Sequence, residues 1–167
     1  MRIRQHQADD FRQLADLRWL LKTGDGTIDP GVDRAAFLDD YLEDLRSSDQ
    51  AGDTVHWVIE DRDRLIGSMT IRTVRKELSP GEAPGAWGYL TNSFVRPEMR
   101  GLGHGTELLA RAISWSRARR LELLIVWPSE RSYAFYRRAG FSGQSDPLQL
   151  SLTPMQDAEV PGAWDRK

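Results

Sequence analysis

Two stretches in the N-terminal third of the chain carry apolar residues at helical spacing. The first stretch follows Asp9 or Asp10, either of which is a candidate N-cap. Its apolar positions are Phe11, Leu14, Leu17 and Leu21. The second stretch follows Asp33, and its apolar positions are Phe37, Leu38, Tyr41, Leu42 and Leu45. Glycine and proline between residues 22 and 30 separate the two stretches, so the pattern predicts two amphipathic helices that cover a sheet.

Five further segments have the pattern of strands, and they cover residues 2–5, 54–60, 65–74, 87–95 and 121–126. In the second of these, Val55, Trp57 and Ile59 alternate along the chain and are expected to face the core. A polar turn over residues 61–64 predicts a hairpin between the second and third segments. Residues 75–86 are rich in proline and glycine and are predicted to form a loop.

The segment over residues 121–126 is almost continuously apolar, which is typical of a strand that is covered on both faces. A helical pattern that starts near Gly103 precedes it. The predicted buried positions of that helix are Leu108, Leu109, Ala112, Ile113 and Trp115. The order of strand, helix and strand predicts a right-handed parallel pair formed by residues 87–95 and 121–126.

The C-terminal part of the chain is predicted to begin with a helix over residues 129–139, which stops at Gly140. Closing strands are predicted around Phe141, Leu148, Leu150 and Leu152, and the tail over residues 154–167 is expected to be loose. A chain of 167 residues with 40% hydrophobic content is long enough for one domain and short for two. We therefore expect a single domain over residues 1–167.

A glycine-rich turn, Arg100-Gly101-Leu102-Gly103-His104-Gly105-Thr106, joins a predicted strand to a predicted helix. Glycine allows positive φ and a close approach of the backbone, while the first N–H groups of a helix and its positive end attract an anion. The turn therefore predicts a site for a phosphorylated cofactor. Its spacing matches neither the Walker A loop nor the Gly-x-Gly-x-x-Gly dinucleotide fingerprint.

Taken in order, the Arg100-x-x-Gly103-x-Gly105 turn, the helix, the apolar strand and the AFYRRAGF segment of residues 134–141 resemble the GCN5-related N-acetyltransferase (GNAT) family, which uses acetyl-coenzyme A (acetyl-CoA). The specific part of the resemblance covers residues 87–141. It implies an α/β fold with a mixed, mostly antiparallel central sheet, flanked by helices, in which a parallel pair of strands splays to admit acetyl-CoA. The implied reaction is direct transfer of an acetyl group to a primary amine.

The resemblance also implies roles for particular residues. Tyr136 would be the catalytic acid that protonates the departing coenzyme A thiolate. Ser129 stands where many family members carry an asparagine that binds pantetheine. The implied cofactor-binding residues are Phe94, Val95, Arg100, Gly101, Leu102, Gly103, His104, Gly105, Thr106 and Ser129. The strand before the turn lacks the glutamate that some relatives use as a general base, so no carboxylate base can be assigned from the family.

Several of these roles have alternatives in the sequence. Tyr133 offers a second hydroxyl one turn before Tyr136, and Tyr136 could instead be a core aromatic. His104 could serve as a base, although its place inside the turn favours a role for its backbone N–H. The remaining candidates for the base are Glu60, Glu77, Glu82, Tyr89 through water, and bulk solvent.

Composition excludes several kinds of chemistry. The chain has no cysteine, which rules out disulfides, thiolate metal sites and a cysteine acyl-enzyme, and so favours direct transfer. Its three histidines are scattered along the chain, and we expect no metal site. No apolar run is long enough to span a bilayer, and no apolar signal region opens the chain. We therefore expect a soluble cytoplasmic protein.

Charge is unevenly distributed although the net charge is only -2. The acids between residues 25 and 53 are Asp25, Asp29, Asp33, Asp39, Asp40, Glu43, Asp44, Asp49 and Asp53. Arginines crowd the later helices, near the expected site of the anionic cofactor. The acidic segment could steer a small-molecule or peptide acceptor that is cationic. Without interleaved aromatic residues or a basic isoelectric point, nucleic acid is not an expected partner.

Two rival functions use the same residues. The missing carboxylate base and the serine at position 129 fit a noncatalytic acyl-CoA-binding or regulatory module. A nucleotide-binding oxidoreductase could use the same glycines, but the dinucleotide spacing is absent. Homodimers are frequent in the family that the chain resembles, which makes a homodimer a candidate assembly.

Overall fold

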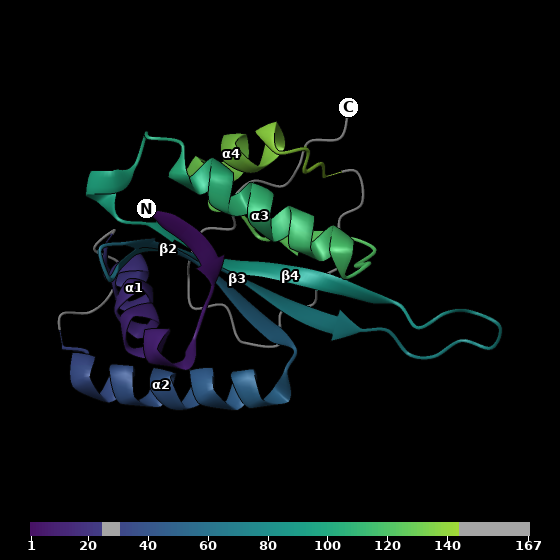
Figure 1. Cartoon of the computed structure of the whole chain (residues 1–167), viewed down its shortest axis with the longest axis horizontal. Coiled ribbons are helices and arrows are strands. Elements are labelled where there is room, and N and C mark those ends of the chain that lie inside the picture. The colour runs from purple at the N-terminus through teal and green to yellow at the C-terminus, as the bar shows by residue number, and fades with distance from the viewer. Residues whose placement is uncertain (25–30, 144–167) are drawn as a thin grey trace, which may run out of the picture.

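The computed structural model describes residues 1–24 and 31–143, which form a five-stranded sheet with helices on both faces (Figure 1). The strands, in their order across the sheet, are β1 (Arg2–Gln5), β2 (Thr54–Asp61), β3 (Arg64–Arg75), β4 (Ala86–Val95) and β5 (Leu124–Val126). All neighbours pair antiparallel except β4 and β5, which are parallel. The predicted fold class is therefore confirmed.

The helices form two layers. Their bounds are α1 (Phe11–Thr23), α2 (Arg34–Ala51), α3 (His104–Ala118) and α4 (Tyr133–Arg138), with short 3-10 helices η1 (Ala8–Asp10), η2 (Pro97–Met99) and η3 (Glu130–Ser132). Helices α1 and α2 cover one face of the sheet, and α3 and α4 lie over the other (Figure 1). Within the described residues, no helix is long and apolar enough to cross a membrane.

Both faces of the sheet are buried. The alternation of apolar residues in β2 predicted burial of only one of these faces. Val55 and Ile59 face α3, as expected, and Trp57 is partly buried beside them. His56 and Val58, which point to the other face, are also buried, and Val58 packs under α1 and α2. A strand between two helical layers buries both sets of alternating side chains, so its pattern is no longer simple alternation.

The two predicted helix caps behave differently. The Asp33 carboxylate accepts a hydrogen bond from the Ala35 N–H at 2.8 Å, which confirms it as the cap of α2. Asp10 precedes α1, but its side chain makes no capping bond to that helix. It accepts instead from the Gln7 N–H at 2.7 Å and from Arg4. The competing partner is a partly buried arginine of β1, which a local capping pattern cannot reveal.

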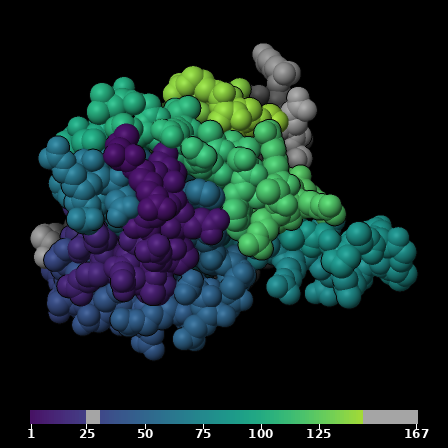
Figure 2. All heavy atoms as spheres, viewed as in Figure 1, coloured from purple at the N-terminus to yellow at the C-terminus, as the bar shows by residue number. Residues whose placement is uncertain are grey.

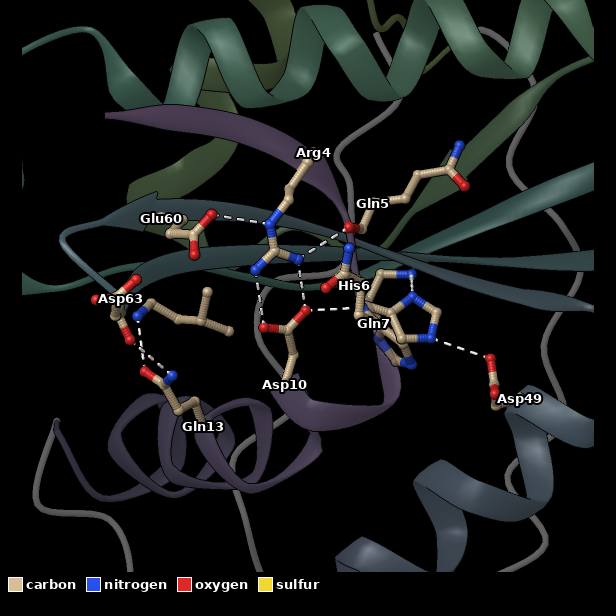
Figure 3. A network of polar contacts seen from close by, with 11 residues as sticks. Arg4, Gln5, His6, Gln7, Asp10, Gln13, Asp49, Glu60 and Asp63 are labelled. Atoms are coloured by element: carbon tan, nitrogen blue, oxygen red, sulfur yellow. Dashed lines mark hydrogen bonds and ion pairs between the residues drawn. The ribbon is translucent and has the colours of Figure 1, made fainter.

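Arg4 is the centre of a polar network beneath the sheet edge (Figure 3). Its guanidinium donates to both carboxylate oxygens of Asp10, at 2.6 and 3.0 Å, and to Glu60 at 2.9 Å. Burial alone would raise the pKa of Asp10, but the bonds from Arg4 and Gln7 together outweigh burial and hold it below its ordinary value. The network fixes β1 and η1 to β2.

We expect Asp10→Asn to lower the free energy of unfolding by about 2 kcal/mol, because it removes the charged partner of Arg4 from a largely buried ion pair. Glu60 still compensates part of the Arg4 charge, which keeps the loss moderate. Urea denaturation near pH 7 measures it. Asp9→Asn, at the exposed neighbouring position, is the matched control. Equal stabilities for the two variants would contradict this role for the network.

The C-terminal elements differ from the prediction in their bounds. Strand β5 contains only the last three of the six predicted residues. Two further backbone bonds extend its pairing with β4, because the Glu122 N–H donates to the Ala86 carbonyl and the Gly88 N–H donates to the Leu123 carbonyl. The predicted last helix is divided into η3 and α4. Gly140 has φ of +93°, as its predicted role as a stop requires. Phe141, which was predicted to begin the closing strands, is not in a strand and packs against Tyr136 instead. The other predicted residues of those strands, and the tail, lie outside the described residues.

Candidate active site

The turn between β4 and α3 has the backbone of an anion cradle. Gly101 and Gly103 have φ of +78° and +84°, a region that other residues enter at a cost, and Gly103 is the N-cap of α3. The N–H groups of residues 102–105 have no hydrogen-bond acceptor within the described part of the chain. Four amides that converge at a positive helix end fit the pyrophosphate of acetyl-CoA.

The cradle lies against the end of β4 and against α4. A Cβ atom at Gly105 would lie 3.6 Å from the Phe135 ring and 3.8 Å from the Val95 side chain. The Arg100 side chain folds back along β4, where Nε donates to the Val95 carbonyl at 2.9 Å and the guanidinium lies 5.6 Å from the centre of the Phe94 ring. The structure thus brings together the residues predicted from Phe94 to Thr106.

Strand β4 leaves β5 at a bulge. The last parallel pair joins Leu90 to Val126, and β5 ends there. The register between β3 and β4 then shifts, so that two residues of β4, Asn92 and Ser93, lie opposite the single residue Met69 of β3, and Asn92 has φ of +51°. Beyond Leu90, the outer edge of β4 has no neighbouring strand among the described residues. An extended pantetheine arm could pair with that edge.

Tyr136 points at this bulge from α4. Its hydroxyl donates to Oγ of Ser93 at 2.8 Å, and the side chain is buried between the rings of Phe135 and Phe141. Burial raises the pKa of Tyr136, and the bond to Ser93 only partly opposes that shift. The side chain is therefore a neutral phenol near pH 7, with a proton that it can donate.

Other residues predicted from sequence lie elsewhere. Tyr133 is 43% exposed, which separates it from the buried Tyr136. Ser129 is exposed, and its hydroxyl bonds to that of Ser132 at 3.1 Å. His104 begins α3, so its N–H belongs to the cradle. No contact in the described chain links Ser129 to the cradle.

The candidate bases are also distributed over different places. Glu60 is engaged by Arg4 at the far side of the sheet. Glu77 and Glu82 are exposed in the loop between β3 and β4, which projects from the body of the molecule (Figure 2). Tyr89 lies on β4, three residues before Asn92, and its ring meets that of the exposed Trp127 edge-on at 5.0 Å. Among these candidates, Tyr89 is the one on the strand of the bulge.

A small polar cavity on the opposite side of β4 was not predicted from sequence. Its polar lining consists of Arg18, Tyr41, His56, Ser68, Thr70 and Asn92. Sequence reasoning placed Tyr41 on an apolar helix face and His56 between apolar strand residues. One signal was present, because an asparagine inside an apolar strand is a residue that tolerates positive φ and so marks a bulge.

His56 is buried in the lining of this cavity. Its Nδ1 lies 2.8 Å from Oγ1 of Thr70, and its Nε2 has no partner within the described residues. Burial, together with the nearby His6 ring, lowers the pKa of His56 to about 3. His6 itself bonds to Asp49 on α2 at 3.0 Å (Figure 3). His56 is therefore neutral at physiological pH.

The lowered pKa of His56 predicts that the protein loses stability in mild acid. Between the ordinary pKa of 6.5 and the folded value of about 3, the unfolded chain binds a proton at His56 and the folded chain does not. The free energy of unfolding is therefore highest at pH values above the ordinary pKa of His56, and it decreases as the pH falls below that pKa. We expect a loss of about 1 kcal/mol between roughly pH 7.5 and pH 5.5, measured by urea denaturation. His56→Gln, which cannot titrate, should lack most of this dependence, and a variant that kept all of it would contradict the assignment.

The profile of the Acetyltransferase (GNAT) family matches residues 11–141, and the chain belongs to this family. Glucosamine 6-phosphate N-acetyltransferase of Trypanosoma brucei brucei is 29% identical over 89 residues, which are 53% of this chain and 58% of that protein. The chain thus spans little more than half of that relative. The family and this relative are both named for acetyltransferases.

Solved structures share the fold at low sequence identity. A predicted acetyltransferase from Clostridium acetobutylicum, solved with acetyl-CoA, has a TM-score of 0.75 and 22% identity, over 90% of this chain and 96% of that one. A GCN5-related N-acetyltransferase from Ralstonia eutropha JMP134 has a TM-score of 0.71 and 21% identity, over 92% and 97% of the two chains.

Among the described residues, no cluster of three or more potential metal ligands occurs.

Proposed function

We propose that this chain transfers an acetyl group from acetyl-CoA directly to a primary amine. The observation that carries the proposal is the convergence of the cradle at residues 100–106, the open edge of β4 and the pair formed by Tyr136 and Ser93 at one end of the sheet. We propose that the cradle amides hold the pyrophosphate, that Phe94 and Val95 line the pantetheine arm, and that Ser129 contacts that arm from the β5 side.

In the proposed reaction, the amine nitrogen attacks the thioester carbonyl carbon and the carbon–sulfur bond breaks. The proton lost by the amine leaves to a base or to solvent, and the thiolate takes the phenolic proton of Tyr136. Solvent then restores that proton. A positioned acid is useful here because the thiolate is the leaving group, and burial keeps Tyr136 protonated until it is needed.

The amine must first lose a proton, since an alkylamine has a pKa of about 10.4. Tyr89 is our candidate for passing that proton through water to solvent, because it lies on the strand of the bulge. The exposed acids of α2 support a cationic ammonium group on the acceptor, which they would attract as it approaches. We also propose a cytoplasmic location, with which a chain without cysteine is compatible.

The test is a free-thiol assay with purified protein, acetyl-CoA and an amine panel, followed by mass spectrometry of the products. The panel contains polyamines, amino acids, peptide N-termini, an amino sugar and its phosphate, the last because a relative is named for glucosamine 6-phosphate. Amine-dependent thiol release with an equal yield of amide is expected. Tight acetyl-CoA binding without turnover on any amine would favour the noncatalytic module.

A further inference from the structure

The cavity on the α1 and α2 side of β4 contains a guanidinium that has no counter-ion among the described residues. Arg18 is half-buried there, and its Nη1 donates to Oδ1 of Asn92 at 2.5 Å. None of the described carboxylates lies within ion-pair range of it. Asp44, the acid that acts on the neighbouring Tyr41, is already paired with Arg72 at 3.5 Å. A half-buried cation in this position is stabilised when a ligand supplies the negative charge.

Two side chains of the cavity lining, Arg18 and Tyr41, have donors that no described residue accepts. Asn92 uses both ends of its amide, because it accepts from Arg18 and donates to the Tyr41 oxygen at 3.0 Å. The Tyr41 hydroxyl hydrogen has no acceptor among the described residues, and burial raises the pKa of Tyr41, so it stays protonated. A guanidinium has five N–H donors in a planar fork, of which Asn92 uses one. The lining therefore offers N–H and O–H groups to an oxygen ligand.

The buried ring of His56 gives a second sign that something polar enters the cavity. It is only 3% exposed, it lines the same space as Arg18, and its Nε2 has no partner in the described residues. Buried polar atoms are nearly always hydrogen-bonded, often to water or a ligand. The space is about 10 Å³, which is the room of one water molecule. A larger ligand would therefore sit at the mouth of the cavity, against Arg18.

The location relates this cation to the proposed reaction. Asn92 and Ser93 are consecutive residues of the β4 bulge. Asn92 contacts Arg18 on one face of the sheet, and Ser93 contacts Tyr136 on the other. An acceptor that reaches the thioester from the α1 and α2 side would thus present its other groups to Arg18.

We propose that Arg18, supported by Asn92 and Tyr41, binds an oxyanion group, a carboxylate or phosphate, that the amine acceptor carries beside its amine. The inference rests on the proposed acetyl transfer and narrows its acceptor to small amines that bear such a group. The acids of α2 and Arg18 then act on opposite ends of one zwitterionic molecule.

Matched acceptor pairs test the inference in the wild-type protein. One pair is an amino acid and its amide, and the other is an amino sugar phosphate and the free amino sugar, so the two pairs separate carboxylate from phosphate. We expect kcat/KM to be at least 10-fold higher for the anionic member of one pair. Equal values within both pairs, with turnover present, would overturn the inference and leave the proposed function intact. If no amine is turned over, the proposed function fails and the inference fails with it.

Variants at position 18 separate binding from support of the bulge. Arg18→Gln should raise KM for the preferred anionic acceptor roughly 10- to 100-fold, while KM for its neutral partner and the Kd for acetyl-CoA stay unchanged. Arg18→Lys keeps the charge without the planar fork and should recover part of the loss. Arg12→Gln, on the exposed face of α1, is the control. Equal losses on both members of a pair would show a merely structural role and overturn the inference.

Discussion

Acetyl-CoA binding is expected to be lost in Gly103→Asp, with the fold retained. Nothing lies within 4 Å of a Cβ atom at this position, and aspartate tolerates the left-handed backbone better than most residues. Its carboxylate would occupy the space in front of the unpaired amides and repel the pyrophosphate. Two unit charges 4 Å apart in an effective dielectric near 20 repel by about 4 kcal/mol, so Kd should rise by at least about 100-fold. Calorimetric titration measures it.

Gly52→Asp is a matched control for this substitution. Gly52 also has positive φ, +69°, and no neighbour within 4 Å, but it ends α2 far from the cradle in the sequence. The Gly52→Asp substitution introduces the same strain and the same charge, and the Kd of this variant for acetyl-CoA should equal that of the wild type. Circular dichroism checks that both variants fold. Tight binding by a folded Gly103→Asp protein would place the cofactor elsewhere.

The second large effect is expected for Tyr136→Phe, which should lower kcat by about 10²- to 10³-fold, because general acid catalysis contributes that much. The Kd for acetyl-CoA should change little, since the ring still fills its place between Phe135 and Phe141. Loss of the bond to Ser93 should cost about 1 kcal/mol of folding stability. A discontinuous assay of thiol release at saturating acetyl-CoA gives kcat.

Tyr133→Phe serves as the comparison, because Tyr133 begins the same helix but is exposed. Its kcat should match that of the wild type. If Tyr133→Phe is the slow variant and Tyr136→Phe is not, the acid is Tyr133. If neither is slow, solvent protonates the thiolate and Tyr136 is a core residue.

The elements that sequence reasoning predicted best are those with strong local signals. The helix with Leu14 and Leu17 on one face, the hairpin around residues 61–64 and the stop at Gly140 each depend on neighbouring residues. The cradle was visible because positive φ at Gly101 and Gly103 is itself a local requirement.

What sequence reasoning missed depends on contacts between distant residues. The partner of Asp10 is Arg4 on the adjacent strand, and that pairing displaced the expected cap. The neighbour of Tyr136 is Ser93, 43 positions earlier, and that of Asn92 is Arg18, 74 positions earlier. Neither pair follows from helical or strand periodicity, because the bulge reverses the alternation of side chains along β4. Leu90 and Phe94, four positions apart, therefore pack on opposite faces of the sheet. Periodicity therefore indicates which residues are buried and not which buried residues meet.

The most direct test of the account is a titration of acetyl-CoA into isotope-labelled protein, followed residue by residue through backbone amide resonances. The account predicts saturable shifts that are largest at residues 101–106 and along β4 at Phe94 and Val95, with little change in η1 beside Arg4. The Gly103→Asp protein should show no such shifts. Saturable shifts centred elsewhere, or none in the wild type at millimolar acetyl-CoA, would contradict the proposed cofactor site.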